Sequence, residues 1–319
     1  VVGARLCWSG VITLRSTVWG ANYPRAIRAR IAGKFATIQA IVLAGISGAI
    51  GLSMDWDQEA YRWAYPLAAV VGLLGTAAYS RVRMRGHAAL IRHEREAMTS
   101  VNPLRPSLNP LHILSFLRGD PKFMKFMGCQ FLLGTGNMMI SAPLIIVLTT
   151  VYMMDYVQAI AIMATIPILL MPFSIPLWSR FLDRVHIIRF RAVHSWIFII
   201  ATLVLVFSVA TGWLAGLWIV AVIRGIAFGG GVLAWNLGHL DFSTTASSST
   251  YMSVHVTLTG LRGLLAPLLG VQIYSMLQEA NPTGWVVFSI AMVIGTAGAT
   301  GFVLMARHLG ADSGQIPTD

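Results

Sequence analysis

The amino-acid sequence predicts an all-α membrane protein, a bundle of helices that cross a bilayer many times. Of its 319 residues, 56% are hydrophobic and only 11% are charged, whereas a soluble domain carries about 25% charge. The apolar runs are about 20 residues long without a two-residue alternation, which predicts helices rather than the strands of a barrel. Lysine and arginine gather in every second connection, as they do in multi-pass proteins.

Nine spans are expected, in chain order, before and after one long connection. Their ranges are 1–21, 35–54, 64–80, 124–150, 156–178, 193–211, 214–237, 252–275 and 285–306. Each run is long enough to cross a hydrocarbon core of about 30 Å. Successive crossings must alternate between the two sides of the membrane, so the charges of the connections test this assignment.

The basic residues lie almost entirely on one side of the predicted bundle. Eighteen of the 23 lysines and arginines fall in connections on that side, and only Arg62 falls in a connection on the other. The other side holds Asp55, Asp57, Asp155 and Glu279 among its acidic residues. The positive-inside rule makes the basic side cytoplasmic. Topology therefore explains the isoelectric point near 10.4, and no nucleic-acid partner is expected.

The longest connection divides the chain into domains. Residues 1–80 carry three spans, 81–123 form a cytoplasmic linker, 124–308 carry six spans and 309–319 form a cytoplasmic tail. No signal peptide is recognisable at Val1, so the chain is expected to start inside a longer protein. The two cysteines, Cys7 and Cys129, both lie in apolar segments, which excludes a disulfide framework and a cysteine metal site. Neither a metal nor a cofactor is expected.

A weak internal repeat supports a two-part architecture. A shift of 219 residues pairs Arg5 with Arg224 and Gly51 with Gly270, and also Gly10 with Gly229. The shift places the three spans before the linker on the last three spans of the chain.

Three motifs resemble those of the major facilitator superfamily. The stretch Arg224–Gly229 resembles the family's Arg-x-x-Gln-Gly motif with one residue inserted. Pro267-x-x-Gly270 resembles a degenerate form of its Gly-Pro motif. Residues Ser179–Arg184 resemble its loop motif Gly-x-x-x-Asp-Arg, with Ser179 in place of the glycine. The resemblance implies two pseudo-symmetric six-helix lobes, of which this chain holds helices four to twelve, so that the first lobe is incomplete.

The resemblance also implies a function. Members of the family are secondary transporters that move a small solute by alternating access, so we expect a monomeric multi-pass permease of the plasma (inner) membrane. Proton-coupled efflux and organic-anion transport are both open. The linker and the C-terminus are expected in the cytoplasm.

Ionisable residues inside spans are costly and mark sites. Arg5, Arg224 and Arg262 lie within spans, and the spans hold no carboxylate at mid-membrane. These three arginines favour an anionic or amphipathic substrate. For Arg224 and Arg5, the alternative is an arginine that ties helix ends together through backbone carbonyls. Arg15 lies nearer the cytoplasm and is expected to snorkel.

Two polar stripes complete the expected binding site. His255 and Arg262 share one helical face, and the histidine could couple transport to a proton; a solvated interfacial histidine is the alternative. Gln130 and Asn137 share a face of the 124–150 span with Gly134 and Ser141. Such a stripe bonds a neighbouring helix or lines water, and the resemblance favours lining.

A gate is expected at Asp183 and Arg184, in a tight cytoplasmic loop. In the family this loop makes and breaks contacts between states, and the aspartate could cap the helix that follows; a plain topogenic loop is the alternative. His186 and His194, which flank the loop, are expected to be solvated.

Other function classes find less support. An intramembrane enzyme would need a nucleophile–base pair or a His-Glu-x-x-His metal set, and the spans contain neither. The chain is therefore not expected to be an enzyme. A channel or a transport-inactive relative of the family stays open.

Overall fold

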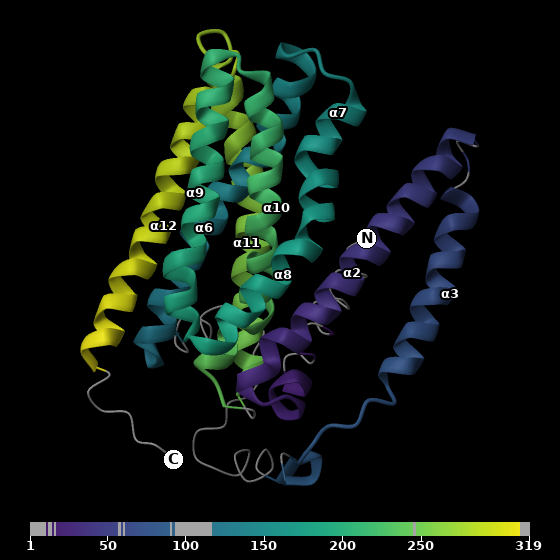
Figure 1. Ribbon diagram of the computed structural model, residues 1–319, viewed down its shortest axis with the longest axis vertical. Helices are drawn as coiled ribbons and strands as arrows, with labels where there is room; N and C mark the ends of the chain where they lie inside the picture. The colour runs from purple at the N-terminus through teal and green to yellow at the C-terminus, as the bar shows by residue number, and fades with distance from the viewer. Residues whose placement is uncertain are drawn as a thin grey trace.

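The described residues form an all-α bundle, in which one helix before the linker leans against a larger group of helices and the next stands apart from that group (Figure 1). The computed structural model describes residues 11, 15, 17–56, 59, 61–89, 91–92, 117–244 and 247–312. The α-helices are α2 (Arg25–Trp56), α3 (Tyr61–Tyr79), α6 (Pro121–Ile146), α7 (Tyr156–Ile160), α8 (Ile166–Arg184), α9 (Ile187–Thr211), α10 (Leu214–Leu237), α11 (Ser248–Leu277) and α12 (Trp285–Asp312). Short π-helical turns, Val147–Val151 and Ala161–Thr165, and a 3-10 turn, Gly238–Asp241, extend α6, α7 and α10.

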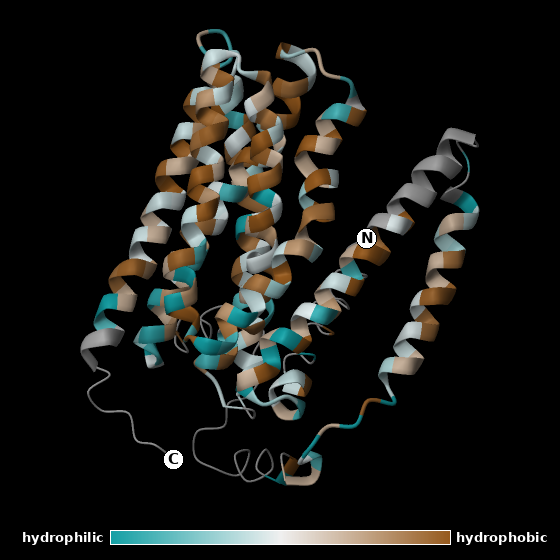
Figure 2. Ribbon diagram, in the orientation of Figure 1, coloured by the Kyte–Doolittle hydropathy of each residue, from teal (hydrophilic) through white to brown (hydrophobic). Residues whose placement is uncertain are grey.

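The last six expected spans correspond to helices that are long and apolar enough to cross a membrane. Within the described residues these six are Pro121–Val151, Val157–Arg184, Ile187–Thr211, Leu214–Asp241, Ser248–Leu277 and Trp285–His308. α2 and α3 match the second and third expected spans, and most of 1–21 lies outside the described residues. Apolar residues run along these helices, and hydrophilic ones gather at the end where α2 meets α8 (Figure 2).

The helix ends follow from their sequences. Asp120 accepts a hydrogen bond from the backbone N–H of Phe123 at 2.9 Å, and Pro121 follows it, so α6 starts there. His186 Nδ1 accepts from the backbone N–H of Ile188 at 3.2 Å and starts α9. Gly212 ends α9 in the left-handed conformation, with φ of 73°.

The start of α9 corrects the expected span 193–211. The helix begins six residues earlier, at Ile187, because His186 and Asp241 satisfy its first backbone donors. Asp183 and Arg184 also lie in the last turn of α8 rather than in a loop.

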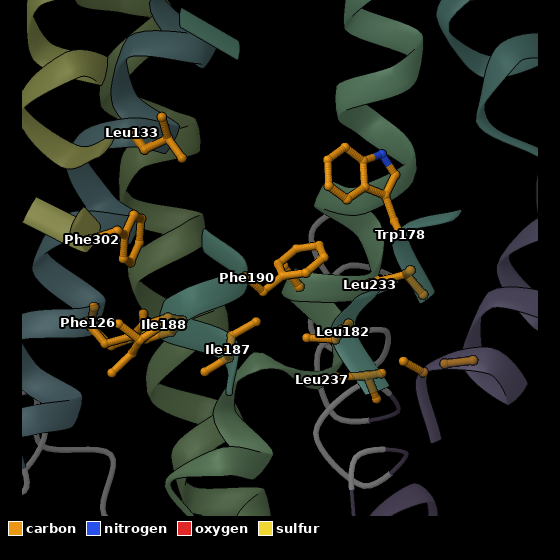
Figure 3. Close-up of a cluster of buried hydrophobic side chains, with 14 of the residues drawn as sticks. Phe126, Leu133, Trp178, Leu182, Ile187, Ile188, Phe190, Leu233, Leu237 and Phe302 are labelled. Carbon is orange, nitrogen blue, oxygen red and sulfur yellow. The ribbon is translucent and has the colours of Figure 1, made fainter. Parts of the chain in front are cut away.

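The helices pack pairwise around two apolar cores. α12 packs on α6 and α9, α11 packs on α6, and α10 packs on α8 and α9. The core near the basic end is aromatic: Phe126 and Phe302 join α6 to α12 with ring centroids 5.5 Å apart, and Trp178 and Phe190 join α8 to α9 at 5.6 Å (Figure 3).

Candidate functional site

A buried polar network links α6, α9 and α11. Gln130 on α6 is 4% exposed. Its side-chain Oε1 accepts a hydrogen bond from Arg191 of α9 at 2.6 Å, and its backbone oxygen accepts one from Arg262 of α11 at 2.7 Å. One glutamine therefore holds two arginines from two other helices.

Arg262 fits here because Gly134 has no side chain. A Cβ at Gly134 would collide with the guanidinium group of Arg262. Arg262 is 6% exposed, and its Nε has no hydrogen-bond partner. Arg262 and Gln130, both expected in the site, are thus brought together, and they join neighbouring helices here.

Arg191, which precedes the expected span 193–211, and His194, which was expected to be solvated, both belong to this network. His194 is fully buried, its Nε2 lies 2.8 Å from the backbone oxygen of Ala227, and its Nδ1 lies 3.2 Å from Arg191. The prediction of a solvated His194 was wrong, because α9 starts early enough to carry both residues into the bundle. Their spacing of three residues on one helical face was the available signal.

His255 is also buried, and the alternative of a solvated histidine does not hold. Its exposed fraction is 0%, and neither ring nitrogen has a hydrogen-bond partner among the described residues. The ring of Trp235 lies 5.6 Å away, centroid to centroid. His239 is equally buried and equally without partners. Unpaired polar atoms of this kind cost about 1–3 kcal/mol each and call for an explanation.

Arg224 stands apart from the network. It is 8% exposed on α10, and its guanidinium carbon lies 5.4 Å from the ring centroid of Phe228. One of its terminal nitrogens is buried without a hydrogen-bond partner. Among the arginines of the described spans, Arg224 alone packs against an aromatic ring without donating a hydrogen bond to a described residue.

For the two remaining residues of the expected binding site, the structure gives less information. Asn137 is half-buried and donates to the backbone oxygen of Leu133 in its own helix at 3.1 Å, so its lining role stays a prediction. Arg5 lies outside the described residues.

The interior of the six described spans is cationic. Their acidic residues are Asp183 and Asp241, and both lie at the basic end. A buried charge is stable only when it is paired or well hydrogen-bonded. Arg191, Arg224 and Arg262 have no carboxylate partner among the described residues.

At the basic end, α2 and α8 meet through a carboxylate and the backbone. Asp183 of α8 accepts hydrogen bonds from the backbone N–H groups of Ala29 and Arg30, at 2.8 and 3.2 Å, in the second turn of α2. The Arg30 side chain donates to the same carboxylate at 3.2 Å. The expectation that Asp183 caps the next helix was wrong: α9 is capped by His186, and Asp183 binds α2, which is distant in sequence.

Small residues allow this close approach. Ala29 and Ala32 are buried on α2. A Cβ at Gly33 would lie 2.9 Å from the Ile175 side chain and 3.3 Å from that of Ser179, both on α8. As in other membrane helix pairs, small side chains bring the two backbones together.

A second acidic residue strengthens the same end. The carboxylate of Asp241 accepts two hydrogen bonds from Arg25, both at 3.1 Å, and one from the backbone N–H of Ile187 at 2.7 Å. Burial lowers the pKa of the neighbouring His186, and the charge of Asp241 opposes that shift. The imidazole is therefore favoured in the neutral form, which its capping role requires.

Arg15 joins the first helices to α10. Its guanidinium donates to Asn236 at the end of α10 and lies 5.0 Å from the ring centroid of Trp19. The hydroxyl of Thr17 lies 3.0 Å from that of Ser248 on α11. Together with α2 and α8, these contacts join the helices before the linker to those after it at the basic end.

The comparisons with known proteins agree with this architecture. A family model described as Major Facilitator Superfamily matches residues 3–267. None of the curated proteins compared with the chain matches it. The match covers most of the chain and contains the motif residues Asp183 and Arg224. Four of the six described spans lie within it, Ser248–Leu277 crosses its end, and Trp285–His308 follows it. The chain is a multi-pass membrane transporter that belongs to the Major Facilitator Superfamily.

Proposed function

We propose that this transporter moves a small organic anion by alternating access, with the α2–α8 contact as its cytoplasmic gate. The observation that carries the proposal is Asp183, which binds three donors of α2 from the last turn of α8. A single carboxylate thus joins the helices before the linker to those after it.

The contact has the composition of a gate that opens. Arg25 and Arg30, which bond Asp241 and Asp183, have side chains that are 52% and 55% exposed. The carboxylates of Asp241 and Asp183 are 12% and 5% exposed in the closed contact, and water can solvate both partners of each pair once the helices part. Small side chains at Ala29, Ala32 and Gly33 leave little apolar surface to separate.

The orientation follows from the charge distribution. The contact lies at the end that carries most lysines and arginines, which the positive-inside rule places in the cytoplasm. The gate then closes the cytoplasmic side of the plasma (inner) membrane, and the linker lies on that side. Arg184, one turn from Arg180, belongs to the same end and is exposed.

The substrate class follows from the unpaired cations. Arg224 is buried without a described hydrogen-bond acceptor, and Arg262 keeps one unpaired nitrogen. An anionic solute bound at either arginine would supply the acceptor that it lacks, and Gln130 holds Arg262 in place. We also assign Arg5 and Asn137 to substrate binding, and His255, which is buried and has no hydrogen-bond partner among the described residues, to proton coupling.

Spin-label distances test the gate. Lys34 on α2 and Arg307 on α12 are exposed at the basic end, so cysteines there, with the two native cysteines replaced by serine, can carry nitroxides. The Asp183→Asn and Arg25→Gln variants should shift the distance distribution to longer values. Identical distributions in the parent and both variants would show that the contact is not a gate.

Uptake by proteoliposomes tests the substrate class. Labelled p-toluenesulfonate is a permanent anion, and tetraethylammonium is a cation of similar size. We expect uptake of the sulfonate alone and a loss of about tenfold or more in Arg224→Gln, as for a buried charge pair worth at least about 1.4 kcal/mol. Arg62→Gln, an exposed arginine paired with Glu59, is the matched control. Uptake of the cation alone would contradict an anionic substrate.

A further inference from the structure

A cationic pocket opens beside the α2–α8 contact. It encloses about 330 Å³ and is lined by Ala26 and Arg30 of α2 and by Arg180, Asp183 and Arg184 of α8. Three arginines from two helices thus surround one aspartate.

The aspartate does not neutralise the pocket. Both oxygens of Asp183 already accept hydrogen bonds from α2, and its side chain is only 5% exposed. Arg180 and Arg184 are exposed, and in the described part of the chain no ion pair or hydrogen bond joins them to another residue. Because they are four residues apart, they lie on one face of α8. Their guanidinium groups are free to bind an anion.

The same face of α8 continues as an apolar stripe into the membrane. Leu169, Phe173 and Leu177 are 51%, 80% and 65% exposed. They follow one another at four-residue spacing, and Arg180 comes three residues later. Exposed apolar side chains therefore run directly into two arginines where the span ends, at Arg184.

We propose that this pocket binds the phosphate headgroup of an anionic phospholipid, with one acyl chain along Leu169, Phe173 and Leu177. Basic pockets between helices on the cytoplasmic side are suited to such headgroups. A soluble phosphate would use the arginines but not the stripe, so the stripe favours the lipid.

The lipid would also act on the gate. Arg30 belongs to α2, whereas Arg180 and Arg184 belong to α8, so one headgroup bridges the two helices and favours their closed contact. This consequence rests on the proposed function of the α2–α8 contact, whereas the binding site itself does not.

Native mass spectrometry of the purified full chain tests the site. Phosphatidylglycerol is added as the anionic probe and phosphatidylcholine as the zwitterionic one. The parent protein should retain phosphatidylglycerol more tightly. The double variant Arg180→Gln/Arg184→Gln should lose about fivefold in affinity for each arginine removed, as expected for a basic group at the membrane surface.

A matched double variant distinguishes lipid binding in the pocket from a general effect of net charge. Arg118→Gln/Arg189→Gln removes two exposed arginines from the same side of the membrane and should bind phosphatidylglycerol like the parent. Equal losses in both double variants, or no loss in the pocket variant, would overturn the proposal. Circular dichroism of each variant establishes that the helices are intact.

Inorganic phosphate distinguishes the two possible sources of the anion. If millimolar phosphate displaces phosphatidylglycerol completely, the site is a free-phosphate site and the lipid proposal is overturned; retention of the lipid supports it. The gate is read separately from the spin-label distances. Lipid binding without a change in the spin-label distances would support the lipid site and contradict the gate. Changed distances without lipid binding would contradict the lipid site alone.

Discussion

The α2–α8 and α6–α11 contacts use the same elements to different effect. In each, a charged side chain binds the backbone of the neighbouring helix: Asp183 binds N–H groups of α2, and Arg262 binds the oxygen of Gln130. In each, a glycine makes room. The Arg30 side chain, which bonds Asp183, is 55% exposed, whereas Arg262 is 6% exposed. When the α2–α8 contact breaks, water solvates its charged groups. When the α6–α11 contact breaks, the charge of Arg262 stays buried without its hydrogen-bond acceptor.

The comparison therefore separates a contact that can open from one that must persist. Substitutions at α6–α11 should unfold the bundle, whereas substitutions at α2–α8 should change its conformational balance.

The largest effect is expected at Gly270 on α11. A Cβ there would collide with the backbone oxygen of Met139 on α6, and backbone cannot move aside cheaply. Gly270→Ala should destabilise the protein by about 3 kcal/mol, the upper range for overpacking, measured by thermal unfolding in detergent. Gly260→Ala on the same helix, where nothing lies within 4 Å, should be neutral or stabilising. Equal stabilities would refute the close approach.

A smaller effect is expected at Gly33, in the α2–α8 contact. The nearest atoms to an added Cβ belong to Ile175 and Ser179 side chains, so Gly33→Val should cost about 2 kcal/mol of contact energy. The Lys34–Arg307 spin-label distance should lengthen while the unfolding temperature stays within a few degrees of the parent. Gly45→Val on the same helix, with nothing within 4 Å, is the control. If Gly45→Val lengthens the spin-label distance as well, the lengthening does not come from the contacts with Ile175 and Ser179.

Asp183→Asn should have a milder effect of about 1 kcal/mol. An amide oxygen still accepts a hydrogen bond, but it loses the extra strength of bonds to a charged acceptor. Limited proteolysis at the basic end should show α2 opening more often. Asp155→Asn changes an aspartate that caps its own helix, with a bond of 2.7 Å to the N–H of Gln158, and should leave proteolysis at the basic end unchanged. Identical cleavage in the parent and Asp183→Asn would argue against the role of the carboxylate.

The smallest effect concerns His186 and pH. Burial lowers the pKa of His186 below its ordinary value of 6.5, so below pH 6.5 the unfolded chain takes up more protons than the folded protein. Stability should therefore fall on acidification from pH 7.5 to 5.5, by less than about 1 kcal/mol, the range for a helix cap. His186→Ser keeps a capping oxygen that does not titrate, and its unfolding temperature should fall less. A steeper fall in this variant would contradict the assignment.

The sequence predicted the helical class and the six later spans because apolar length and loop charge act locally. It misplaced the start of α9 because Arg191 and His194 look like loop residues until Gln130 and Ala227 supply their partners from other helices. Those partners are distant in sequence, and a hydropathy pattern does not show them.

The site was predicted in a similar way. Gln130 and Arg262 were found as polar residues in apolar helices, and the structure joins them. Asp183 was found from its motif, but its partner was sought in the next helix. The donors on α2 are backbone N–H groups, which reasoning from side-chain types does not identify.

That feature affects how the two helices can vary. Two of the three donors that Asp183 binds are backbone N–H groups, which every residue except proline possesses. Residues 29 and 30 can therefore change in chemical character without removing these two bonds, provided they fit the space, whereas position 183 must keep a side chain with acceptor oxygens, and a carboxylate binds most strongly. Natural sequence variation should therefore be broader at residues 29 and 30 of α2 than at residue 183 of α8.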